Sequence, residues 1–377
     1  MLARAPGHNF SLCDLHFAGL QAGSLVRTIT EWLTLRTTAS TPPVSARLNL
    51  LHDRRLLVNN WFVHTCWYLP SLSHFGNPFR SVVCCEPAAS LFLLKTPAGP
   101  LTLPAMKFAI CNEIFKGWKI DEVFKYAANL GYAGVEIAPF TLADSVAEIS
   151  ASERQRIRDS ALHQNIEIAG IHWVLVKPEG LYMNCPDPMV RERTSRYFCE
   201  LVDFCADVGG QVMVVGSPKQ RNILPDVSRE QAWAWAASTF SAAVRQAEAR
   251  KVTICFEPLS PAETNFINTA AEALQFVEQF HSPYFRIILD VKAMCSESKP
   301  IPQLIRESSP HFTHFHANDK NLKGPGFGEV DFHPIAAALK DVRYEGFVSV
   351  EVFNFEEGPE VIASKSLDYL NRTFEKR

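Results

Sequence analysis

The sequence of 377 residues lacks several features that would assign it to a class at once. No apolar run reaches the roughly 18 to 20 residues that a membrane-spanning helix needs. The first residues, Met1 to Phe10, mix Arg, Pro, Gly, His and Asn and contain no apolar stretch typical of a secretory signal. We therefore expect a cytoplasmic protein that does not associate with membranes.

Paired cysteine spacing is also missing. The ten cysteines are scattered along the chain, and none form the CxxC pairs of a zinc knuckle or ribbon. Most of them are expected to be reduced thiols, buried or half-buried, as is usual in a reducing compartment.

Neither sign of charge is in large excess. Lys and Arg number 37 and Asp and Glu number 40, which gives a formal net charge of -3. This balance provides no broad attraction to nucleic acid or to an anionic membrane. With 47% hydrophobic and 20% charged residues, the chain has the composition of a soluble globular protein with a large core. The partner that we expect is a small molecule, and not a nucleic acid.

The first 105 residues lack any sustained period of 3.6 or 2. We interpret residues 1–105 as a poorly patterned N-terminal extension, either a disordered tail or upstream sequence translated before a true start at Met106. A targeting or regulatory segment is the functional alternative. A chain that begins at Met106 is expected to fold and keep full activity, and loss of soluble protein on this truncation would contradict that expectation.

From Met106 onward, short apolar runs alternate with amphipathic helical patterns. Helices are expected over 120–130, where Gly131 is the stop signal, and over 153–163, where Ser152 is the expected N-cap. The expected strands cover 108–111, 134–137, 166–173, 212–215, 252–257, 285–290, a run that ends at 316, and 347–351. Eight strand and helix pairs over roughly 270 residues predict a (β/α)8 TIM barrel, an α/β fold, for residues 106–377.

An open, doubly wound sheet is the alternative architecture. Against it, neither the GxGxxG motif nor a P-loop motif follows any expected strand. The sequence therefore offers no nucleotide-binding turn around which such a sheet would be organised.

Four expected strands end in a side chain that can bind a metal: Glu257, Asp290, His316 and Glu351. In a parallel barrel the carboxyl ends of the strands meet on one face. Three carboxylates in one place repel one another, so we expect a divalent cation between them. Oxygen-rich ligation with a single imidazole suits Mn, Mg or Co better than structural zinc. Each residue alone has an ordinary alternative as a helix cap or salt-bridge partner.

The segments ICFEP, IILDVKAM, HFHANDKN and FVSVEVF resemble the metal-binding segments of the xylose isomerase-like TIM barrel superfamily. They are most similar to the sugar phosphate isomerase and epimerase family that includes tagatose 3-epimerase and hydroxypyruvate isomerase. The resemblance covers residues 106–377. It implies that Glu257, Asp290, His316 and Glu351 are the metal ligands, and that Glu257 and Glu351 are also the catalytic acid/base pair.

The chemistry that the resemblance implies agrees with these residue types. Moving a carbonyl along a sugar, or inverting the carbon next to it, requires removal of a proton α to the C=O group. A metal stabilises the resulting enediolate, and a carboxylate on each face can remove and return the proton. The expected function is a metal-dependent sugar isomerase or epimerase that acts on a small ketose or hydroxy-keto acid.

Other residues are candidates for contact with the substrate. Glu136 and His172 end the second and third expected strands, where family members contact substrate hydroxyls or surround the metal ligands. Phe115 and Trp118 could form an apolar wall, with core packing as the alternative. Lys292 and Lys320 could pair with a carboxylate or phosphate, with a solvated surface as the alternative. His314 is expected in the core or just behind the metal ligands.

One departure from the epimerase pattern is Ala293. The epimerases carry a substrate-contacting histidine at this position, three residues after the aspartate of the sixth strand. Its absence leaves the substrate open and weighs against endonuclease IV, whose three-zinc cluster uses that histidine.

Three further points stay open at the sequence level. A metal-dependent dehydratase of an inosose or dehydroshikimate-like substrate is the nearest alternative, because the same carboxylates would remove the α proton. A second alternative is a barrel that binds a sugar without converting it. The third open point is the oligomeric state: barrels of this family often associate, so a homo-oligomer remains an alternative.

Overall fold

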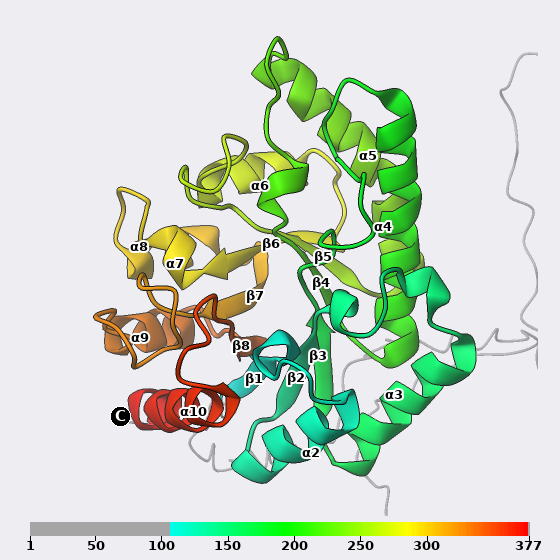
Figure 1. Ribbon diagram of the computed structural model, residues 1–377. Helices are drawn as coiled ribbons and strands as arrows, with labels where there is room; N and C mark the ends of the chain where they lie inside the picture. Colours follow the sequence, from blue (N-terminus) through cyan, green and yellow to red (C-terminus); the bar gives the residue numbers. More distant parts are fainter. Residues whose placement is uncertain (1–105, 376–377) are drawn as a thin grey trace, which may run out of the picture. The chain divides into compact units, whose positions relative to one another are not determined.

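The computed structural model describes residues 106–375, which form a closed barrel of eight parallel strands surrounded by helices (Figure 1). The strands follow one another around the barrel in sequence order, and β8 pairs with β1 to close it. This confirms the predicted TIM barrel. The predicted N-terminal extension, residues 1–105, lies outside the described residues. No helix within the described range combines the length and apolar character that a membrane span requires.

The strands are short and almost entirely buried, because the helices cover one face and side chains from other strands cover the other. Their bounds are Lys107–Cys111 (β1), Gly134–Ile137 (β2), Glu167–Ile171 (β3), Val212–Val215 (β4), Thr253–Phe256 (β5), Phe285–Asp290 (β6), Phe312–Ala317 (β7) and Phe347–Val350 (β8).

Helices follow the strands around the barrel. They are Ile120–Leu130 (α2), Ala151–His163 (α3), Pro188–Val208 (α4), Arg229–Arg250 (α5), Ala270–Glu278 (α6), Val291–Met294 (α7), Ile301–Ser308 (α8), His333–Asp341 (α9) and Pro359–Glu375 (α10). Short 3-10 turns lie at Asn112–Ile114 (η1), Pro139–Thr141 (η2), Val146–Glu148 (η3) and Pro218–Gln220 (η4). The short helix α7 was not predicted.

Capping residues set several of these boundaries. Gly131 ends α2 in the left-handed region with φ of 104°, as its position predicted. Ser228 begins α5 with a capping box. The predicted N-cap of α3 is wrong: Ser150, and not Ser152, accepts the backbone N–H of Glu153 at 3.2 Å. The helix begins two residues earlier than the apolar pattern indicated, because its first turn is polar.

Aromatic packing behind β5 fixes the backbone that leads into Glu257. Phe256 contacts Phe240 of α5 and Phe276 of α6, with ring centroids 5.8 and 4.9 Å apart. Burial of each ring stabilises the fold by roughly 1.5–3 kcal/mol. The buried guanidinium of Arg221 lies over Phe256 and donates a hydrogen bond of 2.7 Å to the carbonyl of Glu257. The residue after β5 is therefore held from several sides.

The strand register places the remaining ends at one level. Asp290 of β6 pairs with His316 of β7, and His316 pairs with Ser349 of β8. Glu351 follows β8 directly. His316 and Glu351, which are 26 and 61 positions after Asp290 in the sequence, therefore lie beside it at the carboxyl face of the barrel.

Candidate active site

Four side chains at the carboxyl ends of β5 to β8 converge on one point. Glu257, Asp290, His316 and Glu351 each place a ligand atom within 4.8 Å of the others, and all four residues are buried. The structure therefore brings together the four residues that the sequence singled out as metal ligands.

Two atoms of this group lack a hydrogen-bond partner. The Nδ1 atom of His316 and the Oε2 atom of Glu351 are buried and lie 3.0 Å apart, without the geometry of a hydrogen bond. Buried polar atoms are almost always satisfied, so an unpaired imidazole nitrogen and carboxylate oxygen that face each other indicate a ligand between them. The residues present fit a divalent cation that prefers oxygen ligands with one imidazole.

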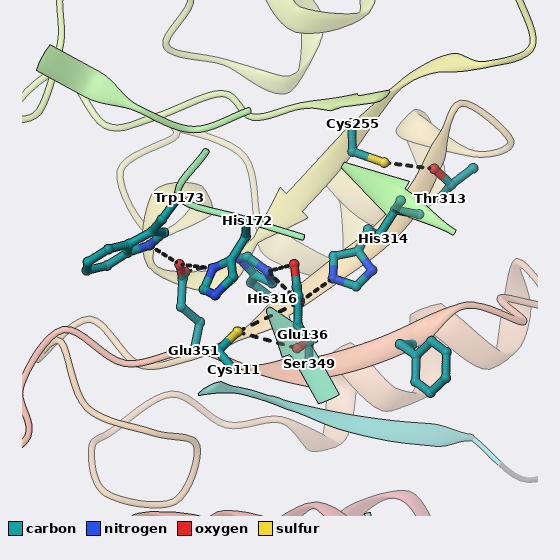
Figure 2. A network of polar contacts seen from close by, with 12 residues as sticks. Cys111, Glu136, His172, Trp173, Cys255, Thr313, His314, His316, Ser349 and Glu351 are labelled. Atoms are coloured by element: carbon teal, nitrogen blue, oxygen red, sulfur yellow. Dashed lines mark hydrogen bonds and ion pairs between the residues drawn. The ribbon is translucent and has the colours of Figure 1, made fainter. Parts of the chain in front are cut away.

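Glu136 of β2 orients His316 (Figure 2). The Nε2 atom of His316 lies 3.2 Å from both carboxylate oxygens of Glu136, which leaves Nδ1 free for the metal. The Glu136 carboxylate also contacts His314 Nε2 at 2.8 Å and the Cys111 thiol at 3.7 Å. Burial alone would raise the pKa of Glu136, but His314 and His316 hold this pKa well below its usual range.

Asp290 is held by one donor from α7 and one from the residue after β7. Its Oδ1 atom accepts the backbone N–H of Ala293 at 2.7 Å, and its Oδ2 atom accepts the side-chain amide of Asn318 at 2.5 Å. Burial and the nearby Glu351 carboxylate raise the pKa of Asp290, although Lys292 acts in the opposite direction.

Glu351 has one oxygen bound by the protein and one left free. Its Oε1 atom accepts the indole N–H of Trp173 at 2.7 Å and lies 3.3 Å from His172 Nδ1 (Figure 2). The other nitrogen of His172 lies 2.8 Å from Glu113. Burial would raise the pKa of Glu351, but His316 and His172 lower it below the usual range of a carboxyl.

Glu257 has the opposite environment. Its carboxylate has no hydrogen-bond partner within residues 106–375, and it lines the cavity described below. Burial, together with the charges of Glu351 and Asp290, raises the pKa of Glu257 to about 8. At neutral pH, without a bound cation, Glu257 is therefore protonated while Glu351 is ionised.

These opposite pKa shifts predict that metal binding releases protons. Because a carboxylate must be ionised to bind a cation, Glu257 should give up about one proton per metal at pH 7 and almost none at pH 9. Calorimetric titration with Mn²⁺ in buffers of different ionisation enthalpy measures this number directly. The variant Glu257→Gln is the control and should release about one proton fewer than the wild-type protein at pH 7. His316, whose pKa Glu351 and Glu136 raise, gives up its proton in both proteins. Equal proton release at pH 7 and pH 9 in the wild-type protein would contradict the prediction.

A cavity of about 420 Å³ opens beside Glu257 and Glu351. Its lining includes Glu257 and Glu351 on the side of the metal group, and Trp173, Val176, Leu259, Phe353 and Pro218 supply apolar surface. Lys292, for which a substrate contact is predicted, also lines it: its ammonium group forms an ion pair of 2.6 Å with Glu263 and lies 3.9 Å from the Phe353 ring centroid. The cavity thus combines charged groups and aromatic rings.

Other residues predicted to contact substrate lie elsewhere. Phe115 and Trp118 pack with Tyr126, with ring centroids 5.3 to 5.9 Å apart, and do not line this cavity, which favours the core-packing alternative. Lys320 is exposed and is also not part of the lining. Glu136 and His172 are completely buried and contact the metal group instead.

Several site residues carried no clear sequence signal. Glu113 lies in η1 and Glu263 in the irregular loop after β5, where no periodic pattern marks a position. Gly216 follows β4, and a Cβ atom there would lie 2.0 Å from Glu257 Oε2. A glycine directly after a strand could have indicated a close approach of another group.

A family model described as xylose isomerase-like TIM barrel matches residues 124–373. D-psicose 3-epimerase of Agrobacterium fabrum is 34% identical over 102 residues, which are 27% of this chain and 35% of that enzyme. The 3-dehydro-D-guloside 4-epimerase of Escherichia coli K12 is 25% identical over 272 residues, 70% of this chain and 99% of that enzyme.

A solved structure has the same fold. The crystal structure of a D-psicose 3-epimerase in the presence of D-fructose superposes with a TM-score of 0.64 at 21% identity, and covers 72% of this chain and 100% of that one. The curated relatives are named as epimerases, which are isomerases, and these names agree with the predicted enzyme class.

Proposed function

Because the chain belongs to the xylose isomerase-like TIM barrel family, we propose that it is a divalent-metal-dependent sugar isomerase or epimerase. Its substrate is a small ketose or hydroxy-keto acid, from which a proton α to the C=O group is removed. The observation that carries this proposal is the pair Glu257 and Glu351. Both lie in the same metal-binding group, both line one cavity, and their pKa values are moved in opposite directions.

The two glutamates have separate roles in this proposal. Glu257, Asp290, His316 and Glu351 would hold a divalent cation (Mn, Mg or Co), which would supply Lewis-acid chemistry at the substrate carbonyl. Glu351, which is ionised, accepts the α proton. Glu257 binds the cation as a carboxylate, takes up a proton from solvent and returns it to the substrate. Return of the proton to the same carbon from the other face gives an epimer, and its delivery to the neighbouring carbon gives an isomer.

The substrate class is supported by the relatives and by the cavity. The matched enzymes are named for D-psicose and 3-dehydro-D-guloside, both carbohydrate substrates. The Lys292 and Glu263 pair lies on the wall of the cavity near Ala293, where the sequence departs from the epimerase pattern. We propose that this pair contacts the polar end of the substrate. We also place the enzyme in the cytoplasm and assign catalysis to residues 106–377.

The proposal is tested by hydrogen exchange with solvent. The Mn-loaded protein is incubated in deuterated water with a panel of ketoses, inososes and keto acids, which are then analysed by mass spectrometry. Uptake of one carbon-bound deuterium, lost in Glu257→Gln, is the expected result. Loss of a water mass would instead indicate the dehydratase. No change across the panel would contradict the proposed α-proton abstraction and leave a binding protein.

A substitution next to Glu257 tests the role of its position. In Gly216→Ala the new Cβ atom would lie 2.0 Å from Glu257 Oε2, and the carboxylate, as the end of a flexible side chain, must move. We expect kcat/KM to fall roughly 100-fold with little change in Tm, because displacement by about 1 Å can cost this much. Combining Gly216→Ala with Glu257→Asp, which shortens the side chain, should restore part of the loss. A kcat/KM within threefold of wild type would contradict the prediction.

A further inference from the structure

Trp173 lines the cavity and contacts one of the four residues, Glu351. It is the second residue after β3, and its φ of 50° lies in the left-handed region that tryptophan rarely adopts. The indole N–H donates a hydrogen bond of 2.7 Å to Glu351 Oε1. Backbone strain of this kind persists only where the surrounding contacts require it, and here it aims a single donor at a single carboxylate.

Two phenyl rings hold the indole in place. Phe140 in η2 and Phe353, shortly after β8, stack against it, with centroid distances of 5.8 and 5.9 Å and interplanar angles of 21° and 23°. Such packing restricts the rotation of the indole ring, so the direction of its N–H group is fixed before any ligand binds.

The second donor to the same oxygen is also held by the protein. His172 Nδ1 lies 3.3 Å from Glu351 Oε1, and its Nε2 atom lies 2.8 Å from Glu113. Oε1 of Glu351 therefore has two nitrogen neighbours within 3.3 Å. Oε2 has no hydrogen-bond partner and faces His316 Nδ1.

We propose that Trp173 is a positioning residue that locks Glu351 with Oε1 on the protein and Oε2 toward the metal. This donor comes from the loop after β3 and orients only Glu351. Glu257 has no comparable donor within the described residues. The proposal rests on the metal-binding part of the proposed function, and it does not depend on which sugar is converted.

The test is the affinity for Mn²⁺ alone, measured by calorimetry or by the EPR signal of free Mn²⁺. Trp173→Phe keeps an aromatic ring and removes the N–H group. Loss of a residue that orients a metal ligand typically weakens metal binding roughly 10- to 100-fold, and this is the expected result. Trp118→Phe is the matched control, because it makes the same substitution at a tryptophan that packs with Phe115 and Tyr126, away from the cavity; it should bind Mn²⁺ within about threefold of wild type.

A double-mutant cycle separates positioning from a general structural effect. If Trp173 acts through Glu351, then Trp173→Phe should change the Mn²⁺ affinity less than about twofold when Glu351 is already alanine. Equal weakening in both backgrounds would overturn the proposal, since it would mean that Trp173 supports the whole site. An unchanged affinity of Trp173→Phe in the wild-type background would overturn it as well.

A second replacement guards against misfolding of the phenylalanine variant. Incorporation of benzothienylalanine at position 173 keeps the bicyclic ring and exchanges only the N–H group for sulfur, so the same loss of Mn²⁺ affinity is expected. Full affinity with this residue would overturn the proposal. If the cycle shows the expected coupling but no substrate in the panel takes up deuterium, the positioning role of Trp173 is supported and the proposed reaction is contradicted. If a substrate takes up deuterium but the cycle shows no coupling, the reaction is supported and the positioning role is overturned.

Discussion

Replacing Glu257 by glutamine is expected to lower kcat by roughly 10³- to 10⁴-fold at saturating Mn²⁺, because the variant loses both a proton-transfer group and a metal-binding charge. Glutamine keeps the size of the side chain, so the packing around Gly216 and Phe256 is preserved. The measurement is the initial rate with the substrate from the panel that shows the fastest deuterium uptake.

The fold of this variant should remain intact. Burial and neighbouring carboxylates disfavour the charged form of Glu257, so a neutral amide removes repulsion in the metal-free protein. We expect the Tm of Glu257→Gln without metal to equal or exceed that of the wild type at pH 8 and above. This result would show that the loss of activity is not caused by unfolding.

Glu263→Gln is the matched control for the same measurement. Glu263 also lines the cavity, and its oxygens bind Lys292 and Ser260, but it is not part of the metal group. Its substitution should act mainly on KM, with kcat reduced far less than in Glu257→Gln. A kcat of Glu257→Gln within tenfold of wild type would contradict the acid/base role of Glu257.

Removal of divalent metal is expected to abolish turnover and to destabilise the barrel. Glu257, Asp290 and Glu351 place three carboxyl groups in one buried group, and without a cation their repulsion is relieved only while Glu257 holds a proton. At a metal concentration 100 times Kd, binding to the folded state alone adds about 2.7 kcal/mol to the free energy of unfolding. For a domain of this size that corresponds to an increase in Tm of roughly 5–10 °C.

The stabilisation by metal should depend on pH in a defined direction. The pKa of Glu257 is raised from 4.5 to about 8 in the folded protein, so the folded state binds more protons than the unfolded state between these values. The contribution of this group to the stability of the metal-free protein is therefore present at low pH and is lost as pH rises toward 8. The difference in Tm between Mn-loaded and metal-free protein should be larger at pH 8 than at pH 6.

Differential scanning calorimetry with and without a chelator measures both effects. Asp290→Asn, which removes one ligand charge, is the control and should show a smaller increase in Tm on addition of Mn²⁺. An identical Tm with and without 100 μM Mn²⁺ would mean that the four residues do not form a metal site at micromolar affinity.

The sequence alone was sufficient to predict the barrel and the four side chains that come together at its carboxyl face. Alternating apolar runs and amphipathic segments after Met106 are local patterns, and a closed parallel sheet is a way to bury all of them. Because parallel strands in a barrel end on one face, polar residues at successive strand ends, such as Asp290 and His316, must come together. This step needs only local pattern and topology.

What surrounds those four residues was decided by the tertiary structure. The donors to Glu351 come from His172 and Trp173, nearly 180 positions earlier in the sequence, and the partner of His316 is Glu136. No local pattern reports which oxygen of a carboxylate is bound and which is free, because that depends on the twist of the barrel and the path of its loops. The same holds for Trp118, which resembles a substrate contact by its place after β1 but packs with Phe115 and Tyr126, away from the lining of the cavity.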